Sequence, residues 1–327
     1  MWLDLLILAA GLTLLVLGGD ALVRGASDLA RRMGVAPVIV GLTVVAFGTS
    51  TPELVVNVAA ALRGSTEIGF GNVVGSNVAN IGLILGVSAL ITPLAIHRTL
   101  VVREIPMMLL ACGVAITLGW QGPGGASGAG FGRSDGVILL LLFSVFLYYT
   151  FADALRQRHD AFLDAVAPQE GPGPLAPPVR AIATMVLLMT GGLALLIAGG
   201  EFAVRGATGF ARGIGVAEAV IGLTIVAVGT SLPEFATSAL AAYRGQSDVA
   251  VGNIVGSNIY NMLFIWGISV TIAPSPVPAG GMVDLIVMTA FSLLLVPLVL
   301  TQNRLSRAEG ALILAGYVGY IGWLVVR

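Results

Sequence analysis

Residues 41–53 read GLTVVAFGTSTPE, and residues 222–234 read GLTIVAVGTSLPE. The two stretches lie at a constant offset of 181, which also aligns residues 18–86 with residues 199–267 without a gap. Of these 69 aligned pairs, 34 are identical. Agreement of this extent indicates that the chain contains a duplicated unit, so each feature of the first copy can be checked against the second.

The composition places this duplicated unit in a membrane. Of the 327 residues, 57% are hydrophobic and 10% are charged, whereas soluble proteins carry about 25% charged residues. This excludes a soluble globular domain, a disordered protein and a secreted disulfide scaffold, and it predicts an all-α polytopic membrane protein. Ten apolar segments are expected to cross the membrane, near 2–20, 36–62, 68–92, 100–118, 136–152, 180–199, 216–242, 249–273, 282–300 and 309–326.

Ten spans and one duplication together predict two inverted five-helix repeats. The first span corresponds to the sixth, and because five crossings separate them, the second copy enters the membrane from the opposite side. Inverted repeats are typical of alternating-access carriers, whose site lies near the midplane where the halves meet. The predicted division is residues 1–152 for the first repeat (motif region 36–92), 153–179 for a cytoplasmic linker, and 180–327 for the second repeat (motif region 216–273).

The distribution of arginine predicts the orientation. All 16 basic residues are arginine, and eleven fall in or beside the loops that follow the odd-numbered spans, against five on the other side. The side richer in arginine is expected to face the cytoplasm, which puts both termini outside. The all-arginine usage is associated with a prokaryotic plasma (inner) membrane.

Two glutamates stand at equivalent positions inside apolar spans. A charge at the bilayer centre costs about 2.5–3.5 kcal/mol on insertion scales, and Glu53 and Glu234 would incur that cost twice. Neither span contains an arginine that could neutralise them. The pair therefore predicts a cation site in which the bound ion supplies the missing positive charge.

The surrounding residues add neutral oxygen atoms. Pro52 and Pro233 lack an N–H group, so the local helix is expected to break and turn carbonyl groups toward a cavity. The same offset aligns GNVVGSNVAN (71–80) with GNIVGSNIYN (252–261), a polar stripe on an apolar helix. Helical spacing gives the following sets on one face: Ala46, Ser50 and Glu53; Ala227, Ser231 and Glu234; Asn72, Ser76 and Asn80; and Asn253, Ser257 and Asn261.

This donor set predicts the class of ion. Carboxylate, carbonyl, hydroxyl and amide oxygens suit Ca²⁺ and Na⁺, and two carboxylates carry the charge that one Ca²⁺ cancels. Transition metals are disfavoured because neither motif contains histidine or cysteine. The expected partners are these two ions and the lipid bilayer. No cofactor, nucleic acid or ATP is expected, since the glycine-rich motifs lack the lysine of a phosphate-binding loop, and nothing in the sequence specifies an oligomeric state.

The paired GTS-x-PE and GSN-x-x-N segments resemble the two repeats of the cation/calcium exchanger superfamily. The chain most resembles its prokaryotic sodium/calcium exchangers, which have ten helices and no regulatory domain. The resemblance implies that Glu53 and Glu234, with the carbonyls of Thr49 and Thr230, hold Ca²⁺, and that Asn80 and Asn261 line the middle of the site. It also implies that the first and sixth spans, which the sequence suggests are shorter and less embedded, form the moving pair. Na⁺ would share both glutamates and use Ala46, Thr49, Ser50, Ser76, Ala227, Thr230, Ser231 and Ser257.

One departure from the family pattern and two alternatives remain. Some relatives carry aspartate at one or both of positions 80 and 261, where this chain has asparagine. In the potassium-dependent relatives an aspartate here goes with potassium use, so Asn261 argues against coupling to potassium. A Ca²⁺/H⁺ antiporter on the same fold stays open, because the glutamates could carry protons. A cation channel is a more distant alternative. Enzyme activity is not expected, since no nucleophile, metal cluster or cofactor motif joins the glutamates.

Overall fold

The structure is a computed structural model that describes residues 2–98, 100–120, 130–166, 179–214, 227–302 and 304–326. Wherever the expected spans fall on described residues, helical segments are present. Among the described residues, seven helices are long and apolar enough to cross a membrane, and an eighth is obtained if the bent pair Pro37–Thr49 and Thr51–Leu62 is counted as one span. The other two are the shorter apolar helix Gly281–Pro297 and the seventh expected span, whose first part lies outside the described residues.

The described part of the first half contains eight α-helices, three π-helical segments and two short strands. In order they are α1 (Trp2–Met33), α2 (Pro37–Val40), η1 (Gly41–Val45), α3 (Ala46–Thr49), α4 (Thr51–Leu62), α5 (Thr66–Ala79), η2 (Asn80–Leu85), α6 (Gly86–Ile91), β1 (Leu94–Ala95), η3 (Leu100–Glu104), α7 (Ile105–Gly119), β2 (Gly130–Phe131) and α8 (Arg133–Val166).

The described part of the second half follows the same plan. Its elements are α9 (Val179–Gly213), α11 (Ala227–Gly229), α12 (Leu232–Tyr243), α13 (Ser247–Ile259), η5 (Tyr260–Ile265), α14 (Trp266–Ile272), β3 (Ser275–Pro276), α15 (Gly281–Gln302), β4 (Arg304–Leu305) and α16 (Arg307–Val326).

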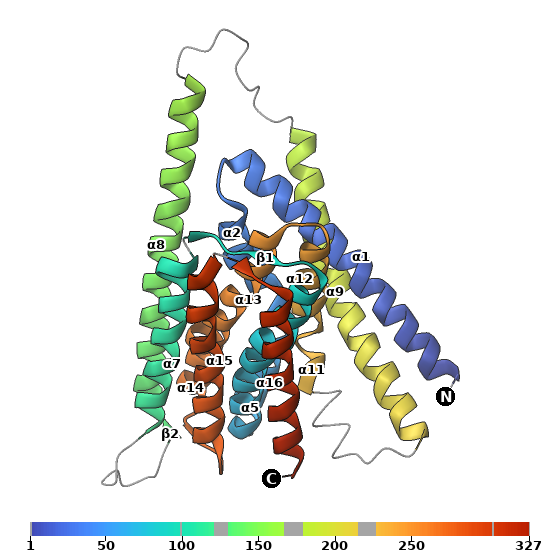
Figure 1. Ribbon diagram of the computed structural model, residues 1–327. Helices are drawn as coiled ribbons and strands as arrows, with labels where there is room; N and C mark the ends of the chain where they lie inside the picture. Colours follow the sequence, from blue (N-terminus) through green and yellow to red (C-terminus); the bar gives the residue numbers. More distant parts are fainter. Residues whose placement is uncertain are drawn as a thin grey trace.

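Two equivalent helices form the centre of the bundle. In the span Ser247–Ile272, 83% of the residues of its apolar window are buried, and in Thr66–Ile91 the share is 72%. Both spans carry a π-helical segment at nearly equivalent places, beginning at Asn80 in one and at Tyr260, one position earlier in the repeat, in the other. Helices α7, α8, α15 and α16 pack around this pair (Figure 1). The polar residues of both motifs are thereby shielded from lipid, which an isolated span could not achieve.

Helices α1 and α9 cross the bundle side by side on its flank (Figure 1). The expectation that these spans are short is wrong: α1 has 32 residues and α9 has 35. Each continues through an i,i+4 ion pair, Asp20–Arg24 or Glu201–Arg205, which supports helix beyond the apolar stretch. The share of the apolar window buried inside the protein is 33% in α1 and 28% in α9, but it is only 22% in α8 and 17% in α16. The two helices are therefore not the least embedded ones, and the expectation of shallow embedding is not confirmed.

Glycines bring these two helices into backbone contact. Gly11 and Gly18 of α1 face Gly199 and Gly192 of α9, and a Cβ atom added at any of the four would lie within 2.9 Å of a backbone atom of the other helix. Small residues permit such close approach in membranes, where packing rather than hydrophobic exclusion drives helix association.

We expect Gly192→Ala to destabilise the protein and the adjacent Gly191→Ala to leave its stability unchanged. A Cβ at Gly192 would lie 2.7 Å from the amide nitrogen of Leu22, whereas one at Gly191 meets no atom within 4 Å. Overpacking of this kind costs about 1–3 kcal/mol. Thermal unfolding of the purified variants, followed by size-exclusion chromatography, measures the difference; equal melting temperatures for the two variants would contradict a tight α1–α9 contact.

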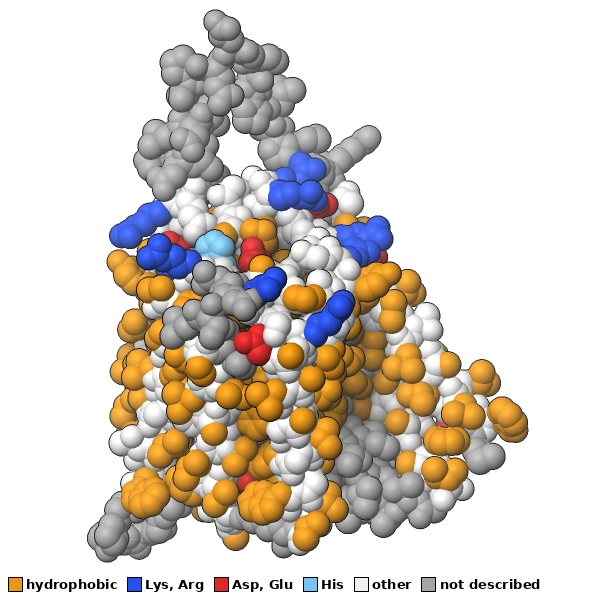
Figure 2. Space-filling view, in the orientation of Figure 1, with side chains coloured by type: hydrophobic (Ala, Val, Ile, Leu, Met, Phe, Trp, Pro, Cys, Tyr) orange, Lys and Arg blue, Asp and Glu red, His pale blue; other side chains and the backbone are white. Residues whose placement is uncertain are grey.

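Two short β pairings mark opposite ends of the bundle. Strand β1 pairs antiparallel with β4 at one end, and β2 pairs antiparallel with β3 at the other (Figure 1). Both chain termini point toward the end that carries β2, as Figure 1 shows. Figure 2 shows arginine side chains gathered at the β1 end, above a belt of hydrophobic side chains. This distribution is that of an integral membrane protein with one arginine-rich face.

Candidate functional site

Two broken helices carry the glutamates. α3 ends at Thr49 and α4 begins at Thr51, so the chain bends by 46° at Ser50. The second copy repeats the break, with α11 ending at Gly229 and α12 beginning at Leu232. Proline occupies the first turn of α4 and of α12, where a missing N–H costs nothing. The expected interruption is therefore present in both copies.

The breaks place both carboxylates at helix N-termini. Glu53 lies in the first turn of α4 and Glu234 in the first turn of α12, and each side chain is only 1% exposed. The positive end of a helix dipole favours a carboxylate in its charged form. These two glutamates therefore have partial compensation for burial but no arginine or histidine partner among the described contacts.

Each glutamate is contacted by the serine of the opposite half. The hydroxyl of Ser50 donates to Glu234 Oε1 at 2.9 Å, and the hydroxyl of Ser231 donates to Glu53 Oε1 at 3.2 Å. The two threonines cross over in the same way. Thr49 Oγ1 donates to Asn253 Oδ1 at 3.1 Å, and Thr230 Oγ1 donates to Asn72 Oδ1 at 3.2 Å. All four bonds form two pairs related by the offset of 181, so the halves enclose one site with approximate twofold symmetry.

Six buried oxygen atoms of the expected site residues have no hydrogen-bond partner within the described residues. They form three pairs across the halves: Glu53 Oε2 and Glu234 Oε2, Ser76 Oγ and Ser257 Oγ, and Asn80 Oδ1 and Asn261 Oδ1. A buried polar atom without a partner costs about 1–3 kcal/mol. These six belong to residues of the two repeated motifs and include both carboxylates, and a desolvated cation has the chemistry to satisfy them.

Ala46 and Ala227 complete the set of expected site residues. Ala46 is fully buried, and its carbonyl accepts the backbone N–H of Ser50 at 3.0 Å, an ordinary helical bond. Ala227 begins α11, and its side chain lies outside the described side chains.

Sequence reasoning missed several buried polar residues around the site. Asn77 and Asn258 belong to the repeated GSN motif, yet they fall off the stripe of every fourth residue and were not assigned a role. Asn57, one turn beyond Glu53, donates from Nδ2 to the carbonyl of Glu53 at 2.9 Å. Its counterpart Ser238 accepts from Asn253 Nδ2 at 2.9 Å. The identity of Asn77 and Asn258 in both copies could have indicated a role for them. The contacts of Asn57 and Ser238 could be found only from the tertiary structure.

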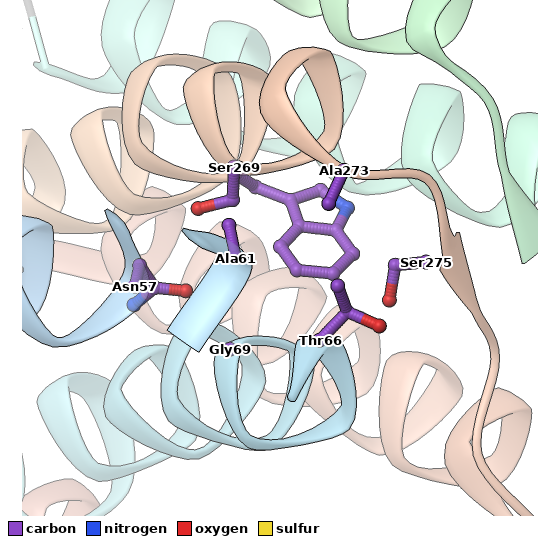
Figure 3. Close-up of a pocket in the computed structure, with 8 residues that line it drawn as sticks. Asn57, Ala61, Thr66, Gly69, Ser269, Ala273 and Ser275 are labelled. Atoms are coloured by element: carbon purple, nitrogen blue, oxygen red, sulfur yellow. The ribbon is translucent and has the colours of Figure 1, made fainter. Parts of the chain in front are cut away.

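Two cavities flank the site. An apolar cavity of about 760 Å³ lies between α9 and the first turns of α4 and α12, and Thr230 lines it. A closed pocket lies on the other side of α4, with no room for a water molecule. Figure 3 shows the side chains of Asn57 and Ser269 facing this pocket, beside Thr66 and Ser275. The larger cavity is therefore the one that brings open space close to the candidate site.

Nearly the whole chain is similar to sodium/calcium exchangers and to another membrane protein. The family model described as "Sodium/calcium exchanger protein" matches residues 3–152 and 184–326. The sodium/calcium exchanger MaX1 of Methanosarcina acetivorans is 30% identical over 97% of both chains. The inner membrane protein YrbG of Escherichia coli is 35% identical over 97% of this chain and 95% of its own. The solved sodium/calcium exchanger from Methanococcus jannaschii superposes with a TM-score of 0.82 at 32% identity, covering 98% of each chain.

Proposed function

Because this chain belongs to the sodium/calcium exchanger family, we propose that it is a secondary antiporter that exchanges Na⁺ for Ca²⁺ by alternating access. Membership in this family of transporters also means that the chain is not an enzyme. The observation that carries the proposal is the set of six buried, unpartnered oxygens described above, drawn equally from both halves.

Glu53 and Glu234 are the ligands that both ions share in this proposal. Together they carry a charge of −2, which one Ca²⁺ neutralises; Thr49 and Thr230 would add carbonyl oxygens. Na⁺ would use the same carboxylates with the hydroxyls and carbonyls of the wider set. Asn80 and Asn261 would line the middle. Since the ions compete for the carboxylates, binding of one expels the other, and this competition couples their fluxes.

The topology that we propose is ten spans in two inverted five-helix repeats, residues 1–152 and 180–327, joined by a cytoplasmic linker over 153–179. The β pairings support it. β1 and β4 follow the third and ninth spans, and β2 and β3 follow the fourth and eighth, which agrees with strict alternation of sides. The ion pair of Asp20 with Arg244 likewise joins the end of the first expected span, within α1, to the residue that follows α12 of the seventh.

The arginine-rich end is proposed to face the cytoplasm, with both termini outside, in a prokaryotic plasma membrane. The arginines at the β1 end support this orientation (Figure 2). α1 and α9 are proposed to form the moving pair. Their packing supports that role, because each of the two helices makes its most extensive contact with the other, on the flank of the bundle.

The proposal is tested by ⁴⁵Ca²⁺ uptake into proteoliposomes. Vesicles loaded with Na⁺ should accumulate Ca²⁺ when diluted into Na⁺-free buffer, and vesicles that carry only an outward H⁺ gradient should not. Uptake driven by protons alone would move the protein to the Ca²⁺/H⁺ alternative and make the glutamates proton carriers. Uptake that does not saturate with Ca²⁺ and needs no counter-ion would indicate a channel.

A further inference from the structure

Four asparagines form a hydrogen-bonded circuit where the central helices cross. Asn80 Nδ2 donates to Asn258 Oδ1 at 2.9 Å, and Asn261 Nδ2 donates to Asn77 Oδ1 at 3.0 Å. Asn77 Nδ2 in turn donates to the backbone carbonyl of Asn258 at 3.3 Å, and Asn258 Nδ2 donates to that of Asn77, also at 3.3 Å. Each of the four side chains is 1% exposed, so water does not compete for these bonds.

The inner pair, Asn77 and Asn258, has no freedom to turn over. Each amide nitrogen carries two hydrogens: one is donated to the opposite backbone carbonyl, and the other points to a thioether, Met288 Sδ for Asn77 and Met108 Sδ for Asn258, at 3.7 Å. Reversing the Asn77 amide would place its oxygen against two acceptors and its nitrogen against the nitrogen of Asn261. The bonds therefore select one orientation, in which Asn77 and Asn258 present oxygen to their neighbours.

This orientation determines what the outer pair presents to the site. Because Asn77 presents its oxygen to Asn261, the amide nitrogen of Asn261 must face Asn77. In the same way, the amide nitrogen of Asn80 must face the oxygen of Asn258. Their oxygens are then directed away from the circuit, and these are two of the six buried atoms without a partner in the described chain. A carboxamide that turned over would instead offer N–H groups, which repel a cation.

We propose that Asn77 and Asn258 are positioning residues, which hold Asn261 and Asn80 with only their oxygens toward the bound cation. The inference rests on the proposed ion site and adds what orients its neutral ligands. A partner asparagine from the opposite half holds each uncharged carboxamide so that only its oxygen faces the cation. Because each partner comes from the other repeat, the ligand orientation depends on both halves being assembled.

The test is a double-mutant cycle on Ca²⁺ affinity. Asn77→Leu keeps the approximate volume but removes the acceptor, so Asn261 can turn over; we expect the Kd and the KM for Ca²⁺ to rise roughly tenfold, as for loss of one neutral ligand. Asn261→Ala should raise them by a similar factor. The variant with both changes should match Asn261→Ala alone, because Asn77 acts only through Asn261.

Binding is measured by equilibrium ⁴⁵Ca²⁺ binding to the purified protein, and KM and kcat by uptake into proteoliposomes. A purely structural role for Asn77 would instead lower kcat or yield while leaving Kd unchanged, or would multiply the effect of Asn261→Ala. Either result overturns the proposal. Should Asn77→Leu fail to fold, Asn258→Leu with Asn80→Ala tests the same circuit in the opposite half, with the same expected and contrary results.

These readouts also separate this inference from the proposed function. If the wild-type protein binds Ca²⁺ but sodium does not drive its uptake, the exchange proposal fails while the cycle on Kd still decides the positioning role. If sodium drives uptake and the effects of the two changes on Kd multiply, the exchange proposal stands and the positioning role fails.

Discussion

Glu53→Gln is expected to abolish Na⁺-driven Ca²⁺ uptake, and Glu234→Gln to do the same. Glutamine keeps the shape of the side chain and removes one of the two negative charges that would neutralise Ca²⁺. In a site where both carboxylates are 1% exposed, water cannot replace the lost charge. We expect uptake into sodium-loaded proteoliposomes to fall by roughly 100-fold or more, since removing one partner of a buried charge pair costs about 3–5 kcal/mol.

Glu67→Gln is the matched control for these variants. Glu67 is exposed in the first turn of α5, so its replacement changes the net charge of the protein equally without touching the site. It should retain wild-type uptake. Elution of all three variants at the wild-type position in size-exclusion chromatography checks that they fold. Uptake near the wild-type rate in either site variant would show that the shared-carboxylate mechanism is wrong.

Ser50→Ala and Ser231→Ala should weaken Na⁺ binding more than Ca²⁺ binding. Each hydroxyl donates to the glutamate of the opposite half, which leaves the lone pairs of its own oxygen available to a bound ion. In the proposed site Na⁺ depends on these neutral oxygens, whereas Ca²⁺ is held mainly by the carboxylates. The Na⁺ concentration for half-maximal exchange should rise roughly tenfold per serine, with a smaller rise in KM for Ca²⁺.

The control for the serine variants is Thr51→Ala, one residue away. The Thr51 hydroxyl donates across the helix break to the carbonyl of Phe47 and makes no described hydrogen bond to the glutamates. Measuring exchange over a range of Na⁺ and of Ca²⁺ concentrations separates the two affinities. An equal shift for both ions would mean that the serines act only by holding the carboxylates, and not as sodium ligands.

Much of the site follows from the duplication alone. The repeated GTS-x-PE and GSN-x-x-N segments identified the family, and the comparisons confirm it. The helix breaks at Ser50 and Ser231 were expected from the prolines that follow them, because a residue without an N–H cannot continue the hydrogen-bond ladder. The assignment of Glu53, Glu234 and their neighbours as ion ligands stays a prediction, which the proposed measurements address.

The lengths of α1 and α9 were misjudged for a physical reason. The expected spans ended where charged residues began, near Asp20 and Glu201. A helix that leaves the membrane needs no apolar residues, however, and i,i+4 ion pairs allow it to continue. Hydropathy locates the membrane boundary of a helix and not the end of the helix itself.

By itself the sequence determined that this protein lies in a membrane and that it is a duplicated unit, and it predicted which carboxylates and hydroxyls are the candidate ligands of a cation. These properties depend on residue type and spacing along one helix. Only the tertiary structure decided which atoms meet: Ser50 contacts the glutamate of the other half, and Asn77 faces Asn261. Such bonds join residues separated by 184 positions, and a side-chain orientation of this kind is set by a partner that no local pattern encodes.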